Sequence, residues 1–412
     1  MPLPTLPTEL LVIIIQYLAD DHEAEGSLYA LRSFCLTNKQ AVDTCRRHLF
    51  STIKLLGDQP NVDHRLLERF LSLLNRNPSL GSYVQDLGIS YMLNASLLED
   101  LKALRYLNTV QTFTFGFSGG NRYAGSRRQW STVPAEMRNH ITSFVHQNPI
   151  SSLVLFGIGQ LTIPFLIDMH HLKNLTAHHV TPGASSVPSY VKVPSMLKSL
   201  KLGEFMAHFT KPFISSPSQS SIFDISNLTK LSMRFHFNES TDVLNWILPL
   251  PTNLKSLKLS LDKDFGVWSC SGNILSILQS SSMASLKSIK LRLSVSNTPT
   301  FSPFGGFIQE LERVSGINSL EDIDIDIVIQ LESYPDMDPA KWNRLDEVLS
   351  SGFPHLRKLN ISTLVAIFFP RGADIWEEAA QIQRDLEILF AENFHWSRKN
   401  LVFTTLATGQ VI

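Results

Sequence analysis

A short apolar pattern recurs along most of this chain and constrains its fold more than any other feature. The pattern is L-x-x-L-x-L, in which isoleucine and valine also occupy the apolar positions. Its last letters alternate between apolar and polar residues, so each copy predicts a short strand with one buried face. The clear copies are LKSLKL from Leu197, LKSLKL from Leu254, LKSIKL from Leu286, LEDIDI from Leu320 and LRKLNI from Leu356.

Looser copies extend the pattern to most of the chain, and successive copies start 22 to 40 residues apart. That spacing suits one strand followed by a helix or an extended return, which indicates an α/β array of stacked repeats. Apolar periodicity predicts helices between some strands, at Val62–Leu74, Asn273–Leu278 and Phe307–Val314. The looser copies start at Val84, Val110, Ile150, Leu172 and Leu228.

This arrangement resembles a leucine-rich-repeat protein. The resemblance implies a β/α solenoid, or horseshoe, with an irregular repeat over residues 53–370. The strands would line its concave face, and the helices would form its convex back. Residues 371–412 differ from the repeats: Asp374 and Glu377 form a capping-box pattern before an apolar helix, and Leu401–Leu406 alternate like a strand. We expect this segment to cover the open end of the repeat core.

The first fifty residues are helical in pattern. Leu10, Ile13, Ile14, Tyr17 and Leu18 recur at helical spacing and define one apolar face. The residues between them are largely apolar as well, so the predicted helix is apolar around most of its circumference. Such a helix needs cover from another element or from another chain.

Residues 1–52 also resemble an F-box. The opening carries Leu6, Pro7 and Glu9 before the apolar helix, and the closing run is Arg46–Phe50. Two features depart from the family pattern: Ala41 stands where the family often has tryptophan, and the loop Asp20–Gly26 is long. The resemblance implies docking onto a Skp-type adaptor and, through it, a cullin scaffold. The implied adaptor-binding residues are Leu6, Pro7, Leu10, Ile14, Leu18, Leu31, Leu36 and Leu49.

Composition narrows the class of protein. The formal net charge of −1 disfavours a general nucleic-acid binder, which usually carries a basic excess. Cysteine occurs at only three positions and without metal-ligand spacing, as is typical of a reducing compartment. The apolar run Leu10–Leu18 is too short to span a membrane. We therefore expect a cytoplasmic or nuclear protein without a membrane segment.

Two motifs suggest chemistry, and neither has the context that this chemistry requires. Ser118 lies in a G-x-S-x-G sequence, but a loop-like segment follows where a hydrolase needs a helix. The pairs His170–His171 and His178–His179 have no third ligand type at a suitable spacing. No phosphate-binding glycine loop occurs. The sequence thus predicts a protein without catalysis, cofactor or metal.

Outward positions of the repeat strands carry a basic stripe, followed by an acidic strand with Asp322, Asp324 and Asp326. One interpretation is that these charges simply keep the sheet soluble. The other is that clustered like charges repel one another, and that an acidic or phosphorylated segment of a protein partner relieves this cost. The basic residues of the stripe are Lys201, Lys230, Arg234, Lys258, Lys290 and Arg292.

The two resemblances together imply the substrate-recognition subunit of a Skp-cullin-F-box ubiquitin ligase. Its F-box would dock the adaptor, and its solenoid would hold a protein substrate for ubiquitin transfer by other subunits. The alternative is a leucine-rich-repeat interaction scaffold outside any ligase, in which the first helices only cap the solenoid.

Overall fold

The protein is a mixed α/β chain that forms two compact units. The first unit comprises Met1–Leu172 and His179–Ser186, and the second comprises Lys173–His178 and Val187–Ile412. The computed structural model describes residues 8–20, 25–37, 41–55, 60–90, 100–117, 128–183, 194–203, 222–235, 242–261, 275, 277–278, 280–296, 305–331, 339–369, 375–393 and 401–411.

The first unit opens with three packed helices, α1 (Thr8–Asp20), α2 (Glu25–Thr37) and α3 (Val42–Ser51). Four parallel strands follow in the order β1-β2-β3-β5, and the short strands β4 and β6 pair with each other. The remaining elements are β1 (Thr52–Leu55), α4 (Pro60–Arg76), η1 (Pro78–Tyr83), β2 (Asp86–Ser90), η3 (Asp100–Tyr106), β3 (Thr112–Gly116), β4 (Arg128–Gln129), η4 (Trp130–Thr132), α5 (Ala135–Gln147), β5 (Ser152–Phe156), β6 (Ile158–Gly159) and η5 (Ile163–Phe165).

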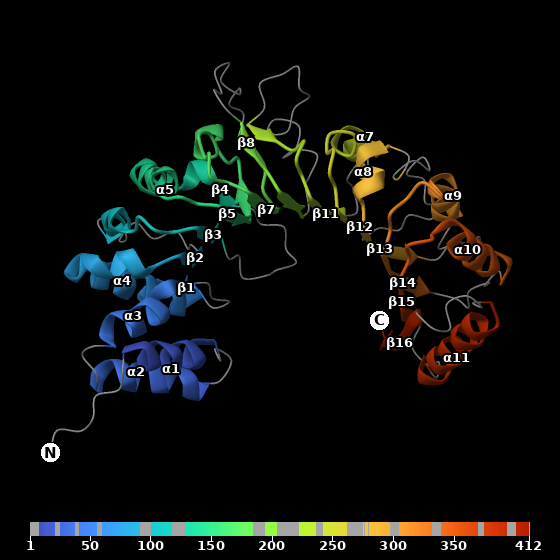
Figure 1. Cartoon of the computed structure of the whole chain (residues 1–412), viewed down its shortest axis with the longest axis horizontal. Coiled ribbons are helices and arrows are strands. Elements are labelled where there is room, and N and C mark those ends of the chain that lie inside the picture. The colour runs from blue at the N-terminus through green and yellow to red at the C-terminus, as the bar shows by residue number, and fades with distance from the viewer. Residues whose placement is uncertain are drawn as a thin grey trace. The chain divides into compact units, whose positions relative to one another are not determined.

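The core of this unit lies between its strands and the helices α4 and α5, which cover one side of them (Figure 1). In-register residues such as Leu87, Phe113 and Leu153 are buried because alternate strand residues face the helices. Phe113 packs edge-on against Phe144 of α5, with ring centroids 4.9 Å apart. This aromatic packing fixes the helix against the sheet.

The second unit repeats the same plan, and its strands lengthen from β11 onward. In its described part, parallel strands follow one another in the order β7-β9-β11-β12-β13-β14-β15-β16, and β8 pairs with β10. The elements are β7 (Asn174–His178), β8 (Ser195–Met196), β9 (Ser199–Leu202), β10 (Phe223–Asp224), β11 (Lys230–Phe235), α7 (Asp242–Ile247), β12 (Ser256–Leu261), α8 (Ser280–Ser285), β13 (Ser288–Ser296), α9 (Gly305–Val314), β14 (Asp322–Leu331), α10 (Pro339–Gly352), β15 (Lys358–Phe369), α11 (Ile375–Asn393) and β16 (Leu401–Val411).

Register divides this sheet into a core face and an outward face. The helices α7 to α11 lie along one side of the strands (Figure 1). Because side chains alternate along each strand, the polar residues between the buried positions point away from these helices. One row of directly paired residues is wholly apolar and at most 1% exposed: Leu200, Leu231, Leu257, Ile289, Ile323 and Leu359.

The predicted strand positions are confirmed. Each of the ten pattern copies contains a strand that begins two residues after the first apolar residue, as β11 does after Leu228. The closing strand is also confirmed and runs further than predicted, to Val411. Helices α4, α9 and α11 lie where the periodicity places them, although the predicted cap Asp374 lies outside the described residues.

One predicted helix is wrong. The described residues of Asn273–Leu278 form turns, and helix α8 starts later, at Ser280. Leu275 and Leu278 are nevertheless buried, so their spacing reflects core contacts of a turn rather than a helical face. The backbone N–H of Leu275 donates to the buried carboxylate of Glu310 at 2.6 Å, which ties this turn to α9. A side chain 35 residues away therefore holds this turn.

Buried polar side chains join consecutive repeats. Asn148 accepts a hydrogen bond from the Val110 N–H and donates one to the Leu107 carbonyl oxygen, at 3.0 and 2.9 Å. Ser282 makes the equivalent pair of bonds, donating to the Pro251 oxygen at 2.7 Å and accepting from the Leu254 N–H at 3.3 Å. These bonds satisfy backbone groups that precede a strand, where no ladder partner is available.

Among the described helices, none is both long and apolar enough to cross a lipid bilayer. The two compact units group the first helices with the first repeats. They do not test the division into residues 1–52, 53–370 and 371–412, which stays a prediction.

Candidate functional site

Helix α1 has two apolar sides with different environments. Leu11, Ile15 and Ala19, one helical turn apart, are at most 3% exposed and face the other two helices. Ile13 and Tyr17 point to solvent, with exposed fractions of 62% and 77%. The face predicted from the sequence is thus the uncovered one, and the covering helices pack on the opposite side.

The buried side of α1 completes a small core of its own. Ile15 and Ala19 pack with Leu31 of α2 and with Ala41 and Cys45 at the start of α3. Ala41 is only 2% exposed, so the small residue that departs from the F-box pattern is a packing residue here. Partly buried side chains close the edge of this core: Leu18, Phe34, Cys35 and Leu49.

The two cysteines of this core are packing residues. Burial raises the pKa of the Cys45 thiol, and the nearby Cys35 adds to the effect. The Cys35 thiol lies 4.0 Å from the Val42 carbonyl oxygen, to which it donates a weak hydrogen bond. A buried thiol with a raised pKa stays protonated and is a poor nucleophile or metal ligand.

Several large apolar residues of α1 and α2 are exposed, and we call this set of residues the α1 face. Soluble proteins rarely leave many large apolar side chains of neighbouring helices exposed unless they bind something. Leu36 at the end of α2 is 87% exposed, more than any other large apolar residue of the described chain. The α1 face comprises Leu10, Val12, Ile13, Ile14, Tyr17, Tyr29 and Leu36.

The residues predicted to bind an adaptor fall into three groups. Leu10, Ile14 and Leu36 belong to the α1 face. Leu31 is 1% exposed, so it supports the surface from within, while Leu18 and Leu49 lie half-buried beside the same core. Leu6 and Pro7 lie outside the described residues. The prediction did not include Val12, Ile13, Tyr17 and Tyr29, whose exposure depends on where α2 and α3 pack.

A second surface is the outward face of the sheet in the second unit. Lys201, Lys230 and Lys258 are exposed on β9, β11 and β12. None of these three lysines forms an ion pair with any residue of the described part of the chain. Arg234 and Arg292 are exposed on the same face. All six residues of the predicted basic stripe therefore lie on the outward face, and five of them are exposed.

Lys290 differs from the other basic residues because its charge is already compensated. Its ammonium group lies 2.7 Å from Asp324 Oδ2 and 3.1 Å from Asp326 Oδ2, both on β14. Partial burial alone would lower the pKa of Lys290, but the hydrogen bonds that its ammonium group donates to the two aspartates, together with their negative charges, outweigh burial and raise the pKa. Asp324 and Asp326 also accept hydrogen bonds from Asn360 and Ser362. The carboxylates of β14 thus neutralise part of the basic stripe where it reaches β13.

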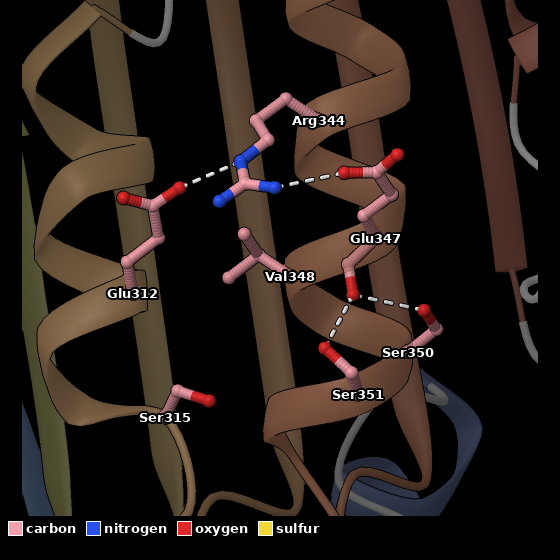
Figure 2. A pocket seen from close by; sticks show the side chains of 7 residues that line it. All are labelled: Glu312, Ser315, Arg344, Glu347, Val348, Ser350 and Ser351. Atoms are coloured by element: carbon pink, nitrogen blue, oxygen red, sulfur yellow. Dashed lines mark hydrogen bonds and ion pairs between the residues drawn. The ribbon is translucent and has the colours of Figure 1, made fainter.

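A pocket of about 530 Å³ lies on the helical side of this unit, between α9 and α10 (Figure 2). Arg344 crosses it and binds Glu312 at 2.7 Å and Glu347 at 2.9 Å. The hydrogen bonds that Arg344 donates to Glu347 and Glu312 raise the pKa of its guanidinium. The charged side chains that line the pocket pair with one another, and Val348 is the one apolar residue among its lining residues. The pocket therefore lacks the apolar lining of a small-molecule site.

The structure describes the two candidate chemical motifs only in part. Ser118 lies outside the described residues, although strand β3 precedes it as the hydrolase motif requires. Within the described residues, no group of three or more histidine, cysteine, aspartate or glutamate side chains is placed to hold a metal. His170 approaches Asp168 at 4.0 Å, an exposed pair.

No family model matches the chain, and a search of curated proteins finds no match either. The structure therefore defines only the fold class, which is a mixed α/β protein with parallel sheets and helices along them.

Proposed function

We propose that this chain is the substrate receptor of a Skp-cullin-F-box ubiquitin ligase, with the α1 face as its adaptor-binding surface. The observation that supports the proposal is that α1 is apolar on two sides but buried on only one of them. Leu11 and Ile15 build the core, whereas Leu10 and Ile14, which match the F-box pattern, stay exposed beside them. A folded helix with a second, uncovered apolar side is what binding to another chain requires.

The chain would contribute no chemical step to ubiquitin transfer. The repeats, which resemble a leucine-rich-repeat solenoid, would hold a protein substrate on the outward face of their parallel strands. The adaptor and cullin would bring a conjugating enzyme to the same complex. Holding both reactants in one assembly raises the effective concentration of substrate lysines near the activated ubiquitin.

Co-purification of a Skp-type adaptor with the full chain tests the proposal. We expect Leu10→Asp with Ile14→Asp to abolish co-purification, because two carboxylates would be buried in an apolar interface. The matched control is Leu73→Asp on α4, whose side chain is 41% exposed, similar to Leu10 at 47%. An adaptor that never binds the wild-type chain, or that binds the double variant equally well, would refute the proposal.

The alternative function is a repeat scaffold whose first helices cap the sheet. One observation favours it: α3 is tied to the first repeats, with Tyr83 Oη donating to Asp43 Oδ1 at 3.1 Å and Gln85 N donating to Ser51 O at 2.9 Å. A cap needs these contacts, but it does not need an exposed α1 face. In that case the Leu10→Asp and Ile14→Asp variant would keep every partner that the wild-type chain binds.

A further inference from the structure

Four basic residues surround one serine on the outward face of the second unit. Ser232 of β11 is directly paired with Lys201 on β9 and with Lys258 on β12. Lys230 and Arg234 lie two residues before and after it on the same strand. Neighbouring strands are about 4.8 Å apart, and alternate residues of a strand are about 6.6 Å apart. The four basic side chains therefore start about 4.8 to 6.6 Å from Ser232, so a phosphate group bound there could contact several of them. We call these four residues together with Ser232 the Ser232 ring.

All members of the Ser232 ring share one face. The residues between them, Leu231 and Met233, are buried on the opposite side, whereas Lys230 and Arg234 are exposed and Ser232 is half-buried. The lysines stand apart from one another because small hydroxyl residues separate them across the strands: Lys230 pairs with Ser199 on one side and Ser256 on the other. This spacing reduces mutual repulsion and leaves room for a group that touches several cations.

The ring combines positive charge with hydroxyl donors, the two features that bind phosphate. A phosphorylated side chain carries a charge of about −1.5 to −2 and three strong acceptor oxygens. Ammonium and hydroxyl groups on three adjacent strands can each donate to one of those oxygens. A single carboxylate would use fewer of these donors, so the arrangement favours phosphate over aspartate or glutamate.

The neighbouring strands limit the length of the anion. Beyond Lys258, the next residue in the same row is Lys290, which Asp324 and Asp326 compensate. A long polyanion that continued across the strands would meet the carboxylates of β14 and be repelled. The charge pattern therefore fits one phosphorylated residue, or a few close together, rather than a nucleic-acid strand.

We propose that the Ser232 ring binds a phosphoserine or phosphothreonine side chain of a protein substrate. This inference rests on the proposed function for the identity of the ligand as a substrate. The site itself rests on the register of β9, β11 and β12. Substrate phosphorylation would then control capture, since the unmodified hydroxyl offers the ring no charge.

Fluorescence anisotropy with the purified full chain tests the inference. The probes are three labelled pools of short peptides with random flanks and phosphoserine, serine or glutamate at the centre, at an ionic strength of about 0.15 M. We expect the phosphoserine pool to bind at least about tenfold more tightly than the serine pool, because charge-assisted hydrogen bonds are stronger than those between neutral groups. The glutamate pool should fall between them.

Single variants locate the site. Lys201→Gln and Lys258→Gln should each weaken binding of the phosphoserine pool about tenfold, and Ser232→Glu should abolish it by placing a carboxylate inside the ring. The matched control is Lys255→Gln, an exposed lysine just before β12 and outside the ring, which should change affinity less than about twofold. Because the four substituted side chains, including the control, are at least partly exposed, these changes leave the core intact.

Several outcomes would overturn the inference. They are equal binding of the phosphoserine and serine pools, an equal loss with Lys255→Gln and Lys258→Gln, or tighter binding of a single-stranded oligonucleotide than of the phosphoserine pool. Adaptor co-purification, measured on the same Lys258→Gln protein, keeps the two proposals separate. A chain that binds phosphopeptide but no adaptor would retain the Ser232 ring and refute the ligase role, and the reverse result would refute only the ring.

Discussion

Three consecutive isoleucines on α1 allow a direct test of the two-sided helix. Ile13, Ile14 and Ile15 are 62%, 39% and 0% exposed, so the same substitution samples surface, edge and core within one turn. Ile15→Ala deletes three buried carbons, which contribute about 2.4 kcal/mol at about 0.8 kcal/mol each, and leaves a cavity among Leu31, Ala41 and Cys45. We expect a loss of about 3 kcal/mol for local opening of these helices.

Hydrogen exchange measured by mass spectrometry reports this opening peptide by peptide. A loss of about 3 kcal/mol should speed exchange in α1 about a hundredfold in Ile15→Ala. Ile13→Ala should change exchange by less than about threefold, since exposed substitutions shift stability by about 0.5 kcal/mol at most. In contrast, Ile13→Ala should weaken adaptor binding about tenfold, as expected for an apolar residue at the centre of an interface.

Exchange in α1 that is as fast in Ile13→Ala as in Ile15→Ala would contradict the exposure of Ile13. That result would mean that the α1 face is covered within the folded chain, and both the exposed surface and the adaptor proposal would be lost. Unchanged adaptor affinity in Ile13→Ala, with normal exchange, would instead place the adaptor elsewhere. Ile14→Ala, at the edge between the two sides, should show an intermediate change in both measurements.

Three further predictions concern the first unit. Asn148→Ala should lower the free energy of unfolding by about 2 to 5 kcal/mol, because it leaves two buried backbone groups unbonded, and chemical denaturation measures this loss. Burial raises the pKa of Asp86, so its charged form opposes folding above that pKa; Asp86→Asn should stabilise the protein at neutral pH, and this gain should vanish in acid. Gly116→Ala should prevent stable folding, detected as loss of soluble protein, because its Cβ would overlap the Phe156 carbonyl oxygen.

The strands could be predicted from the sequence because their signal is local. Each repeat places leucine or isoleucine at alternate positions, and the row from Leu200 to Leu359 is buried as this alternation requires. The start of each of the ten strands in these pattern copies follows from the same six letters. The turn at Leu275 and Leu278 could not be distinguished from a helix in this way, since their three-residue spacing satisfies both structures.

The orientation of α1 could not be predicted because almost every position from Leu10 to Leu18 is apolar. Two faces of the helix were equally suitable for burial. The choice depends on Leu31, Ala41 and Cys45, which lie on other helices and leave no periodic signal in α1. Nonlocal packing therefore decides which apolar residues remain available to a partner.

The compensation of Lys290 had a signal that alignment of the repeats could reveal. Lys290 in LKSIKL and Asp324 in LEDIDI occupy the same position of the pattern, and equal positions are paired across parallel strands. The same comparison places Ser232 between Lys201 and Lys258. What the pattern lacks is the direction of the Lys290 side chain, which follows from the presence of two carboxylates on one neighbouring strand.

The Ser232 ring and the α1 face depend on different forces, so we expect salt to weaken binding at the ring but not at the α1 face. Charged groups at an exposed site are screened within about 10 Å at 0.1 M salt and about 3 Å at 1 M, so phosphopeptide binding at the Ser232 ring should weaken steeply over that range. Apolar burial does not depend on charge, and the adaptor should remain on the α1 face in 1 M salt. Pull-down of the full chain at both salt concentrations measures the two losses together. Release of the adaptor with salt, or phosphopeptide binding that resists salt, would contradict the physical basis assigned to each surface.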